Sequence, residues 1–413
     1  MTVDVSGVVR PRGSGWLVCL LLTTFVIGTD DFVIAGLLPE IAGDVKVSEA
    51  AAGQLVTVFS VTYAIAAPIL AVATARLPRK ALVVGGLTVF AMANVATALA
   101  SGYGLLMAMR VLTALVAASI TPAVFALAGR LSAPERIGRS IGTVAAGLTV
   151  SLFVGVPAGT LVGDAFGWRA TFVAVAVFSV LVAAAAAYFL PHLTGAPEVS
   201  VTQKLRILNR PPILMCVAGT VLGAGSGLMT YTYIAPVTEN LTGQAGAVLA
   251  LFIGVVGVAG AIGTFAGGRL TDRWGADKTL LATFTGLVAA TAALALIGAT
   301  ADRQAPVWLV ALALALWGFT AWGFNPPMNT RALHLAQDAG TEAVALNTSG
   351  LYIGIAIAGA AGGAALSSHH GTGVSVTATA LGLAALLLMI TSVHRHPTTT
   401  PTPDTTPQTS NAV

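Results

Sequence analysis

Three charged side chains interrupt long apolar stretches, and they are the residues best suited to chemistry. Asp30 and Asp31 lie in an apolar run from Trp16 to Leu38, and Arg110 lies in another from Leu105 to Gly129. A charge at the centre of a bilayer costs at least ~2.5 to 3.5 kcal/mol, so such residues usually serve a function. Desolvation favours the neutral form of a carboxyl group, and a nearby arginine favours the ionised form. A carboxyl group balanced in this way can take up and release a proton.

The spacing places Asp31 and Arg110 at similar depths if both runs cross a membrane as helices. Asp31 lies seven residues before Leu38, and Arg110 lies five residues after Leu105. At 1.5 Å per residue both lie roughly 8 to 11 Å from the same membrane face, so the two side chains can meet. Asp30 is rotated by about 100° from Asp31 and points elsewhere. Two alternatives stay open: a static pair of Asp31 and Arg110, and an Asp30 that is hydrogen-bonded between helices.

Polar and aromatic side chains in other apolar runs are candidates for a substrate cavity, which needs apolar walls and a few polar groups. Asn325 and Asn347 are the strongest, because an amide inside a membrane needs partners, and the Pro326–Pro327 pair should break its helix nearby. The alternative for each Trp and Tyr is an anchor at the membrane surface. The predicted set is Gln54, Tyr63, Tyr231, Tyr233, Trp317, Trp322, Asn325, Asn347 and Tyr352.

The composition indicates a membrane protein. Of 413 residues only 9% are Asp, Glu, Lys or Arg and 56% are apolar, whereas a soluble surface needs roughly 25% charged residues. The mean hydropathy is +0.87, and the 46 glycines suit helices that pack closely in lipid. The net charge of +4 does not indicate nucleic acid binding, because the basic residues lie in short clusters between apolar runs. Cys19 and Cys216 lie inside apolar runs, so we expect neither a disulfide nor a metal site.

Apolar runs of about 20 residues, the length that crosses a bilayer, predict twelve transmembrane helices. Six precede a polar stretch, at 16–38, 50–74, 81–100, 105–129, 137–163 and 171–190. Six follow it, at 213–236, 245–268, 279–300, 307–327, 343–366 and 374–393. The first run begins like a signal peptide but lacks a small-residue cleavage site, so we interpret it as an uncleaved helix.

The basic residues predict the orientation. With a cytoplasmic N-terminus, three Lys or Arg fall in outer loops, namely Lys46, Arg169 and Arg303, and Arg110 lies within a helix. The other sixteen of the twenty fall in inner segments. They are Arg10, Arg12, Arg76, Arg79, Lys80, Arg130, Arg136, Arg139, Lys204, Arg206, Arg210, Arg269, Arg273, Lys278, Arg331 and Arg395. Since basic residues accumulate in cytoplasmic loops, we expect both termini in the cytoplasm of a multi-pass protein of the cell membrane.

The two sets of six helices resemble each other. Arg76 and Arg273 lie 197 residues apart, and the same offset takes Trp16 to Ile213, the starts of the first and seventh helices. Repeated halves favour a substrate path between them. We therefore expect a cytoplasmic segment at 1–15, a six-helix half at 16–190, a cytoplasmic linker at 191–211, a second half at 212–393 and a Pro/Thr-rich disordered tail at 394–413.

A short motif follows the eighth predicted helix. Residues 268–275 read G-x-L-x-D-R-x-G, which resembles the cytoplasmic loop signature of the major facilitator superfamily. The matching segment at 71–80 keeps its basic residues but has Ala75 where the family carries Asp. Charged residues in such a turn can pair with groups of the other half and so stabilise one conformation of the transporter. The alternative is that they only fix the orientation of the helices in the membrane. The predicted conformational motifs, which include the Gly-rich fifth helix, are Arg76, Arg79, Gly155, Pro157, Gly159, Gly268, Asp272, Arg273 and Gly275.

The resemblance extends from Trp16 to Val393. Gly147 to Gly163 is similar to the Gly- and Pro-containing fifth helix of the superfamily's drug:proton antiporters, and Arg110 resembles their intramembrane arginine. It implies an all-α fold of twelve helices in two pseudo-symmetric bundles, the twelve-helix branch of that group. It also implies that Asp31 is the coupling carboxylate. Within this branch the sequence is similar to bacterial exporters of sugars, purines and chloramphenicol-type antibiotics.

We therefore expect a proton-coupled antiporter that exports a small, fairly apolar compound, such as an antibiotic or a metabolite, and so contributes to drug resistance. The alternatives are a sugar or nucleobase exporter, or an uptake symporter or facilitator of the same fold. A membrane enzyme or sensor needs a reactive cluster or a signalling domain, and neither is present. We expect a monomer that binds protons and a small molecule, with the proton gradient as its energy source and with no cofactor and no nucleic acid.

Overall fold

The structure is a computed structural model of the 413-residue chain. It describes residues 14–132, 137–191, 193, 210–301, 304–336 and 340–398, and the backbone of 2–3 and 9–10. Most of the predicted linker at 191–211 and of the predicted tail at 394–413 lies outside the described residues. So do Arg12, Arg136, Lys204, Arg206 and Arg303, and the side chains of Arg10 and Arg139.

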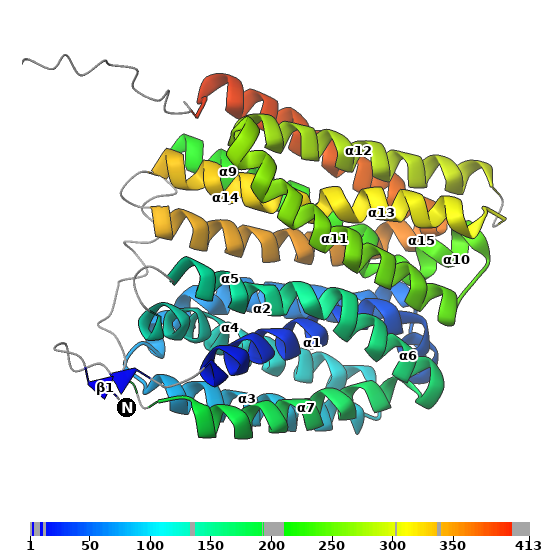
Figure 1. The fold of residues 1–413 in the computed structure, drawn as a ribbon. Helices are drawn as coiled ribbons and strands as arrows, with labels where there is room; N and C mark the ends of the chain where they lie inside the picture. The colour runs from blue at the N-terminus through cyan, green and yellow to red at the C-terminus, as the bar shows by residue number, and fades with distance from the viewer. Residues whose placement is uncertain are drawn as a thin grey trace, which may run out of the picture.

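The described helices form two groups, one above the other in Figure 1. The first contains α1 (Gly15–Val45), α2 (Glu49–Ala73), α3 (Arg79–Ala98), α4 (Tyr103–Leu131), α5 (Ile137–Val150), the π-helical turn η2 (Ser151–Gly155), α6 (Val156–Phe166) and α7 (Trp168–Phe189). The second contains α9 (Pro211–Thr232), α10 (Ile234–Thr242), α11 (Ala247–Trp274), α12 (Ala276–Thr300), α13 (Val307–Gly323), α14 (Asn325–Ala336) and α15 (Gly340–Arg395). We call them the N-half and the C-half.

Eleven of the described helices are long and apolar enough to cross a membrane. The last of them, α15, joins two predicted helices across a kink, where His369 and His370 have non-helical dihedral angles. The predicted all-α fold with twelve crossings is therefore confirmed. The structure adds one short antiparallel pair, β1 (Thr2–Val3) with β2 (Val9–Arg10).

Several helices extend beyond their apolar runs. The first continues through Pro39 to Val45, because Ile41 and Ala42 after the proline are buried in the core. The proline pair has a milder effect than predicted: α13 ends at Gly323 and α14 begins at Asn325, but Phe324 between them keeps helical dihedral angles.

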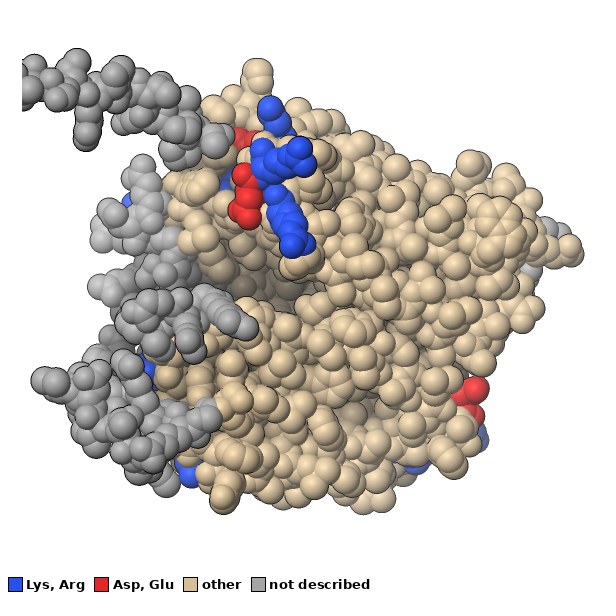
Figure 2. Space-filling model, in the orientation of Figure 1, with Lys and Arg blue, Asp and Glu red and all other residues tan. Residues whose placement is uncertain are grey.

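One end of the molecule carries β1 and the end of α15 (Figure 1). The helix ends that hold most of the described Lys and Arg residues, such as Arg130, Arg210 and Arg273, belong to the same end, which we call the basic end. Figure 2 shows a group of charged side chains on the C-half near this end and a broad uncharged band beside it. Arg269, Asp272 and Arg273 line a surface pocket there. Large apolar side chains of the C-half, such as Leu312 and Phe265, are exposed. Exposed apolar surface of this extent fits contact with lipid tails.

The two halves share one hydrophobic core, and the N-half residues that belong to it lie away from the basic end. Val33 to Ala42 of α1 and Ala52 to Val56 of α2 belong to the same buried cluster as the C-half residues Tyr231, Tyr233 and Ile253. The part of the N-half nearer the basic end, with Leu20, Leu87 and Leu127, forms a separate core. The halves are thus packed together at the opposite end.

The Gly-rich fifth helix is the surface on which α1 rests. A Cβ atom added at any of four of its glycines would contact α1: Gly147 faces Leu21 and Thr24, and Gly155, Gly159 and Gly163 face Thr29, Val33 and Leu37. The Thr24 hydroxyl also donates a hydrogen bond of 2.6 Å to the Val144 carbonyl. Because these glycines leave no side chain in the way, the backbones approach closely, and Asp30 and Asp31 are held at a defined depth.

We expect Gly147→Ala to destabilise the protein by about 1 to 3 kcal/mol, the usual cost of overpacking. Its Cβ would overlap the Leu21 carbonyl oxygen, a backbone atom that cannot move aside cheaply. Gly142→Ala is the matched control. Gly142 lies on the same helix, and a Cβ atom added there would have no described atom of another element within 4 Å. Thermal unfolding of the purified variants in detergent measures the difference, and equal melting temperatures would contradict the close contact.

Candidate proton-coupling and substrate site

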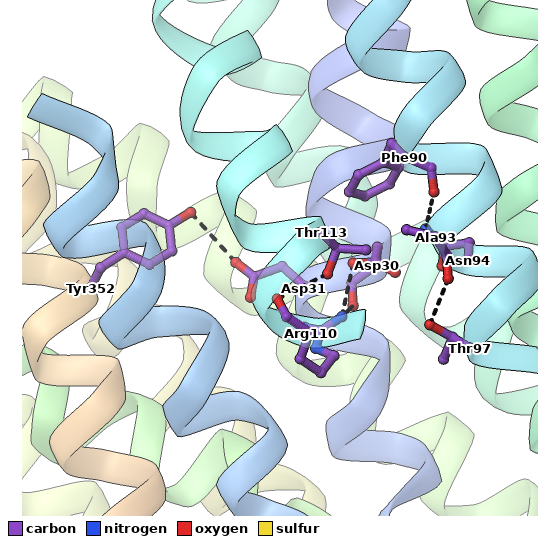
Figure 3. Close-up of polar contacts among 9 residues, drawn as sticks. All are labelled: Asp30, Asp31, Phe90, Ala93, Asn94, Thr97, Arg110, Thr113 and Tyr352. Atoms are coloured by element: carbon purple, nitrogen blue, oxygen red, sulfur yellow. Dashed lines mark hydrogen bonds and ion pairs between the residues drawn. The ribbon is translucent and has the colours of Figure 1, made fainter. Parts of the chain in front are cut away.

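The centre of the N-half holds a buried ion pair. Arg110 of α4 donates a hydrogen bond of 2.8 Å from Nη1 to Oδ2 of Asp30 in α1, and both side chains are at most 2% exposed (Figure 3). The same nitrogen lies 3.3 Å from the Asp30 carbonyl oxygen. Asn94 of α3 lies beside this carboxylate (Figure 3). The pair therefore joins three helices of one half.

Arg110 pairs with Asp30 and not with Asp31, so the structure does not show the alternative of a static Asp31–Arg110 pair, and it does show the alternative of an Asp30 that is hydrogen-bonded between helices. Both carboxyl groups lie at the depth of the arginine, as predicted. The rotation of about 100° per residue decides between them. It turns Asp30 toward α3 and α4 and turns Asp31 toward the C-half (Figure 3).

Asp31 contacts the other half of the molecule. The Tyr352 hydroxyl of α15 donates to Oδ2 of Asp31 at 3.4 Å, a long hydrogen bond (Figure 3). Asp31 is 3% exposed, and Tyr352 stacks on Tyr63 of α2 with 3.8 Å between ring centroids. Asp31 of the N-half thus contacts α15 of the C-half through Tyr352, and the same tyrosine packs against α2 of the N-half.

The charges of this site do not balance. Arg110 neutralises one carboxylate, and Asp31 is a second carboxyl group within electrostatic range of both Arg110 and Asp30. The remaining guanidinium nitrogens of Arg110, Nε and Nη2, have no hydrogen-bond partner among the described residues. The Phe59 ring lies 4.5 Å from the guanidinium carbon, which fits a cation–π contact. Protonation of Asp31 would make the group of three side chains neutral.

Five of the nine predicted cavity residues gather around this centre. Tyr63 and Tyr352 stack next to Asp31. Tyr231 packs edge-on against Phe32 of α1 at 5.7 Å and against Trp322 at 5.6 Å. Trp317 lies behind it, at 6.4 Å from the Tyr231 ring and 5.8 Å from Trp322. Phe32 and Phe59 were missed by the sequence analysis, since a phenylalanine in an apolar run carries no distinguishing signal.

Gln54 and Tyr233 lie apart from this centre. Both donate to the carbonyl oxygen of Gly359 in α15, Tyr233 at 2.6 Å and Gln54 at 3.2 Å. Gly53 of α2 packs against the Tyr233 ring. The structure therefore places these two residues in the seam between α2 and α15, away from the basic end, where they close the halves together.

The predicted amides form a ladder. Thr220 of α9 donates to Oδ1 of Asn347, Asn347 donates to Oδ1 of Asn329 at 2.8 Å, and Asn329 donates to Oδ1 of Asn325 at 3.0 Å. The sequence analysis missed Asn329, although its position one helical turn after Asn325 was a usable signal. The ladder links α9, α14 and α15, and Asn325 at its end is partly exposed.

The motif at residues 268–275 is helical for most of its length. Gly268, Asp272 and Arg273 lie in the last turns of α11, and the chain turns at Gly275, whose φ of 83° favours glycine. In the matching N-half segment Arg76 lies in a turn, while Arg79 begins α3 and donates its N–H to the Leu193 carbonyl at 3.1 Å. Pro157 follows the π-helical turn η2 directly, and Gly155 and Val156 keep helical dihedral angles, so the proline has no N–H to donate to the preceding turn of this continuous helix.

A second buried arginine stabilises the basic end of the C-half. Arg331 of α14 is 0% exposed and pairs with Asp277 at the start of α12. It also donates to the Ser392 carbonyl at 2.9 Å and to the His396 carbonyl at 2.8 Å. The Thr398 N–H donates to Asp277 at 2.8 Å, so α15 and the residues after it are tied to α12 and α14.

We expect Arg331→Lys to lower the melting temperature markedly, since one ammonium cannot reproduce the planar fork that reaches three groups. Loss of a buried partner typically costs about 3 to 5 kcal/mol, so a shift of several degrees is expected. Arg269→Lys is the control, because Arg269 is exposed and stacks on Phe265. Equal melting of the two variants would contradict the structural role of Arg331.

The comparisons with known proteins identify the family. The model of the Major Facilitator Superfamily matches residues 20–342. The chain belongs to the Major Facilitator Superfamily. It is 30% identical over 352 residues to the inner membrane transport protein YdhP of Escherichia coli (strain K12), with 85% of this chain and 89% of that protein covered. It is 33% identical over 350 residues to a chloramphenicol resistance protein of Streptomyces lividans, with 82% and 86% covered.

The fold agrees with this family. A crystal structure of a peptide transporter superposes with a TM-score of 0.75 at 15% identity, over 94% of this chain and 96% of that one. This Major Facilitator protein is therefore a multi-pass membrane transporter. Its sequence resemblance to the superfamily, predicted from the loop motif, is confirmed. Among the described residues no group of three His, Cys, Asp or Glu is placed to hold a metal ion.

Proposed function

We propose that this transporter is a proton-coupled antiporter that exports a small, fairly apolar compound by alternating access of its two halves. One observation carries the proposal: Asp31 is a buried carboxyl group that has no ion-pair partner among the described residues, and it touches Tyr352 across the boundary between the halves. Similarity to a protein named for chloramphenicol resistance supports export. A sugar or nucleobase exporter, an uptake symporter and a facilitator are the competing functions.

The proposed role of Asp31 is to link protonation to the packing of the halves. An ionised Asp31 accepts the Tyr352 hydroxyl and leaves the site with one excess negative charge. Uptake of a proton removes that charge and weakens the hydrogen bond, since ionised acceptors bind more strongly than neutral ones. The contact between α1 and α15 then costs less to open. Arg110, held by Asp30, is the fixed positive charge that favours proton release again.

The proton gradient supplies enough energy for such a cycle. A proton that falls through ~100 mV releases ~2.3 kcal/mol, and each pH unit adds ~1.4 kcal/mol. For ~100 mV and one pH unit the sum is ~3.7 kcal/mol, which corresponds to between two and three decades of substrate gradient per proton. The motifs around Arg76 and Gly275 and the Gln54 seam are the proposed elements that hold alternate closed states.

The proposed orientation has both termini in the cytoplasm. It would place the basic end inside and the seam of Gln54, Tyr233 and Gly359 at the outer face. In this arrangement the halves at 16–190 and 212–393 are packed together on the outside.

Everted membrane vesicles energised by respiration test the function. Their lumen is acidic, and an antiporter releases lumenal protons when its substrate is added outside. We expect a rise in lumenal pH on addition of chloramphenicol, with sugars and nucleobases tested in parallel as the competing substrates. Transport that proceeds equally well without a pH gradient would identify a facilitator instead.

A further inference from the structure

Two hydrogen-bond donors in the C-half point to the chemistry of the substrate. The first is the hydroxyl group of Tyr231, which has no hydrogen-bond partner among the described residues although the side chain is only 2% exposed. A buried hydroxyl without a partner is costly, and native proteins rarely leave one in place without a function. Tyr231 faces Phe32 of α1 and lies within electrostatic range of Asp31, so it borders the boundary between the halves.

The second donor is the amide nitrogen of Asn325. Its oxygen accepts the hydrogen bond from Asn329, and the direction of the ladder from Thr220 through Asn347 and Asn329 is set by these bonds. With its oxygen occupied, Asn325 presents its two N–H groups as the end of the ladder. A chain of aligned amides polarises its members, so the terminal donor is strengthened.

Trp322 connects the two donors. Trp322 precedes Asn325 by three residues, so the two side chains are neighbours on one helical face. The Trp322 ring packs edge-on against the Tyr231 ring, with 5.6 Å between the ring centroids. Gly260 of α11 packs against the other side of that indole. Tyr231, Trp322 and Asn325 therefore form one wall, aromatic in the middle and with a donor at each end. Facing it across the boundary lie Phe32 and Asp31 of α1.

We propose that this wall binds a neutral aromatic compound through an acceptor group, such as a carbonyl or nitro oxygen, with Tyr231 and Asn325 as the donors. The proposal rests on the proposed function, for which it names the substrate class. A cationic compound would leave both donors without a partner. Its charge would instead require Asp31, the group that carries the proton.

Equilibrium binding to the purified full chain in detergent tests this assignment. Isothermal titration calorimetry compares chloramphenicol, a neutral nitroaromatic amide, with tetraphenylphosphonium, an aromatic cation that lacks acceptors. We expect Tyr231→Phe to weaken chloramphenicol binding about 3- to 10-fold, the effect of one lost hydrogen bond. Asn325→Leu should do the same, and tetraphenylphosphonium binding should not change in either variant.

Tyr103→Phe is the matched control. The Tyr103 hydroxyl donates to the Ala51 carbonyl at 2.6 Å in the N-half, so its loss should lower the melting temperature without changing chloramphenicol binding. Tyr231→Phe should leave the melting temperature unchanged or raise it, because that hydroxyl makes no hydrogen bond within the described part of the chain. This contrast separates a binding role from a folding role.

Three outcomes overturn the proposal: Tyr231→Phe binds chloramphenicol as the wild type does, the variant weakens both probes equally, or the wild type binds only tetraphenylphosphonium. Binding needs no gradient, so these outcomes are independent of proton coupling. A wild type that exchanges protons for tetraphenylphosphonium alone would retain the proposed function and lose this inference. Transport that does not depend on the proton gradient, together with the expected binding pattern, would retain this inference and overturn the proposed function.

Discussion

Asp31→Asn should abolish concentrative transport while leaving substrate exchange intact. Asparagine keeps the shape of the side chain and an oxygen that accepts the Tyr352 hydroxyl, but it cannot bind or release a proton. With ~100 mV and one pH unit as the driving force, one proton per substrate supports a steady-state substrate ratio of up to about 500, and this ratio should fall to nearly 1. Proteoliposomes with an imposed pH gradient measure this ratio. Counterflow of labelled against unlabelled substrate measures exchange, which requires no net movement of protons.

Asp44→Asn is the control for this experiment. Asp44 also lies in α1, but its partner is Arg169 at 2.5 Å and both side chains are about two-fifths exposed. Its replacement should leave the substrate ratio unchanged. If Asp31→Asn still concentrates substrate as the wild type does, Asp31 is a packing residue and the coupling must lie elsewhere or be absent.

Asp30→Asn should destabilise the protein by about 3 to 5 kcal/mol, because Arg110 loses the charged partner that it contacts and keeps only Asp31, which lies within electrostatic range but forms no ion pair with it. Two other guanidinium nitrogens already have no partner among the described residues, so the helix bundle offers little compensation. Thermal unfolding of purified protein, followed by tryptophan fluorescence, measures the loss. This effect differs in kind from that of Asp31→Asn, which changes coupling and not folding.

A double variant completes the test. Asp30→Asn combined with Arg110→Met removes both charges, and it should recover much of the stability that Asp30→Asn loses. Asp44→Asn is the control for this stability experiment too, because loss of its exposed ion pair with Arg169 should lower the free energy of unfolding by at most about 1 kcal/mol. Melting of Asp30→Asn at the wild-type temperature would show that Arg110 does not depend on Asp30.

The candidate site was partly visible in the sequence. Asp30, Asp31 and Arg110 could be selected because charge is rare in apolar runs, and their common depth followed from the rise of a helix. Their pairing could not be selected, because a rotation of 100° decides it and small changes in helix packing shift that rotation. The grouping of Tyr231, Trp322 and Tyr352 near Asp31 needs three helices of the C-half and one of the N-half, which no local pattern specifies.

The amide ladder and the seam show the same limit. Asn325 and Asn347 were recognised by their burial cost, whereas Asn329 was missed because it lies outside the predicted apolar run. Gln54 and Tyr233 looked like cavity residues by type, yet they share the Gly359 carbonyl in a packed interface. Residue type indicates that a polar group needs a partner; it does not indicate which one.

The sequence by itself determined the number of membrane crossings, the division into two halves and the family, because these depend on segment length, on charge counts and on a motif contiguous in the chain. The tertiary structure alone decided that Asp30 takes Arg110 and that Asp31 meets Tyr352. It also decided that the Tyr231 hydroxyl has no partner among the described residues. Those results depend on helix rotation and on contacts between residues 80 and 321 positions apart, which the packing of the bundle as a whole sets.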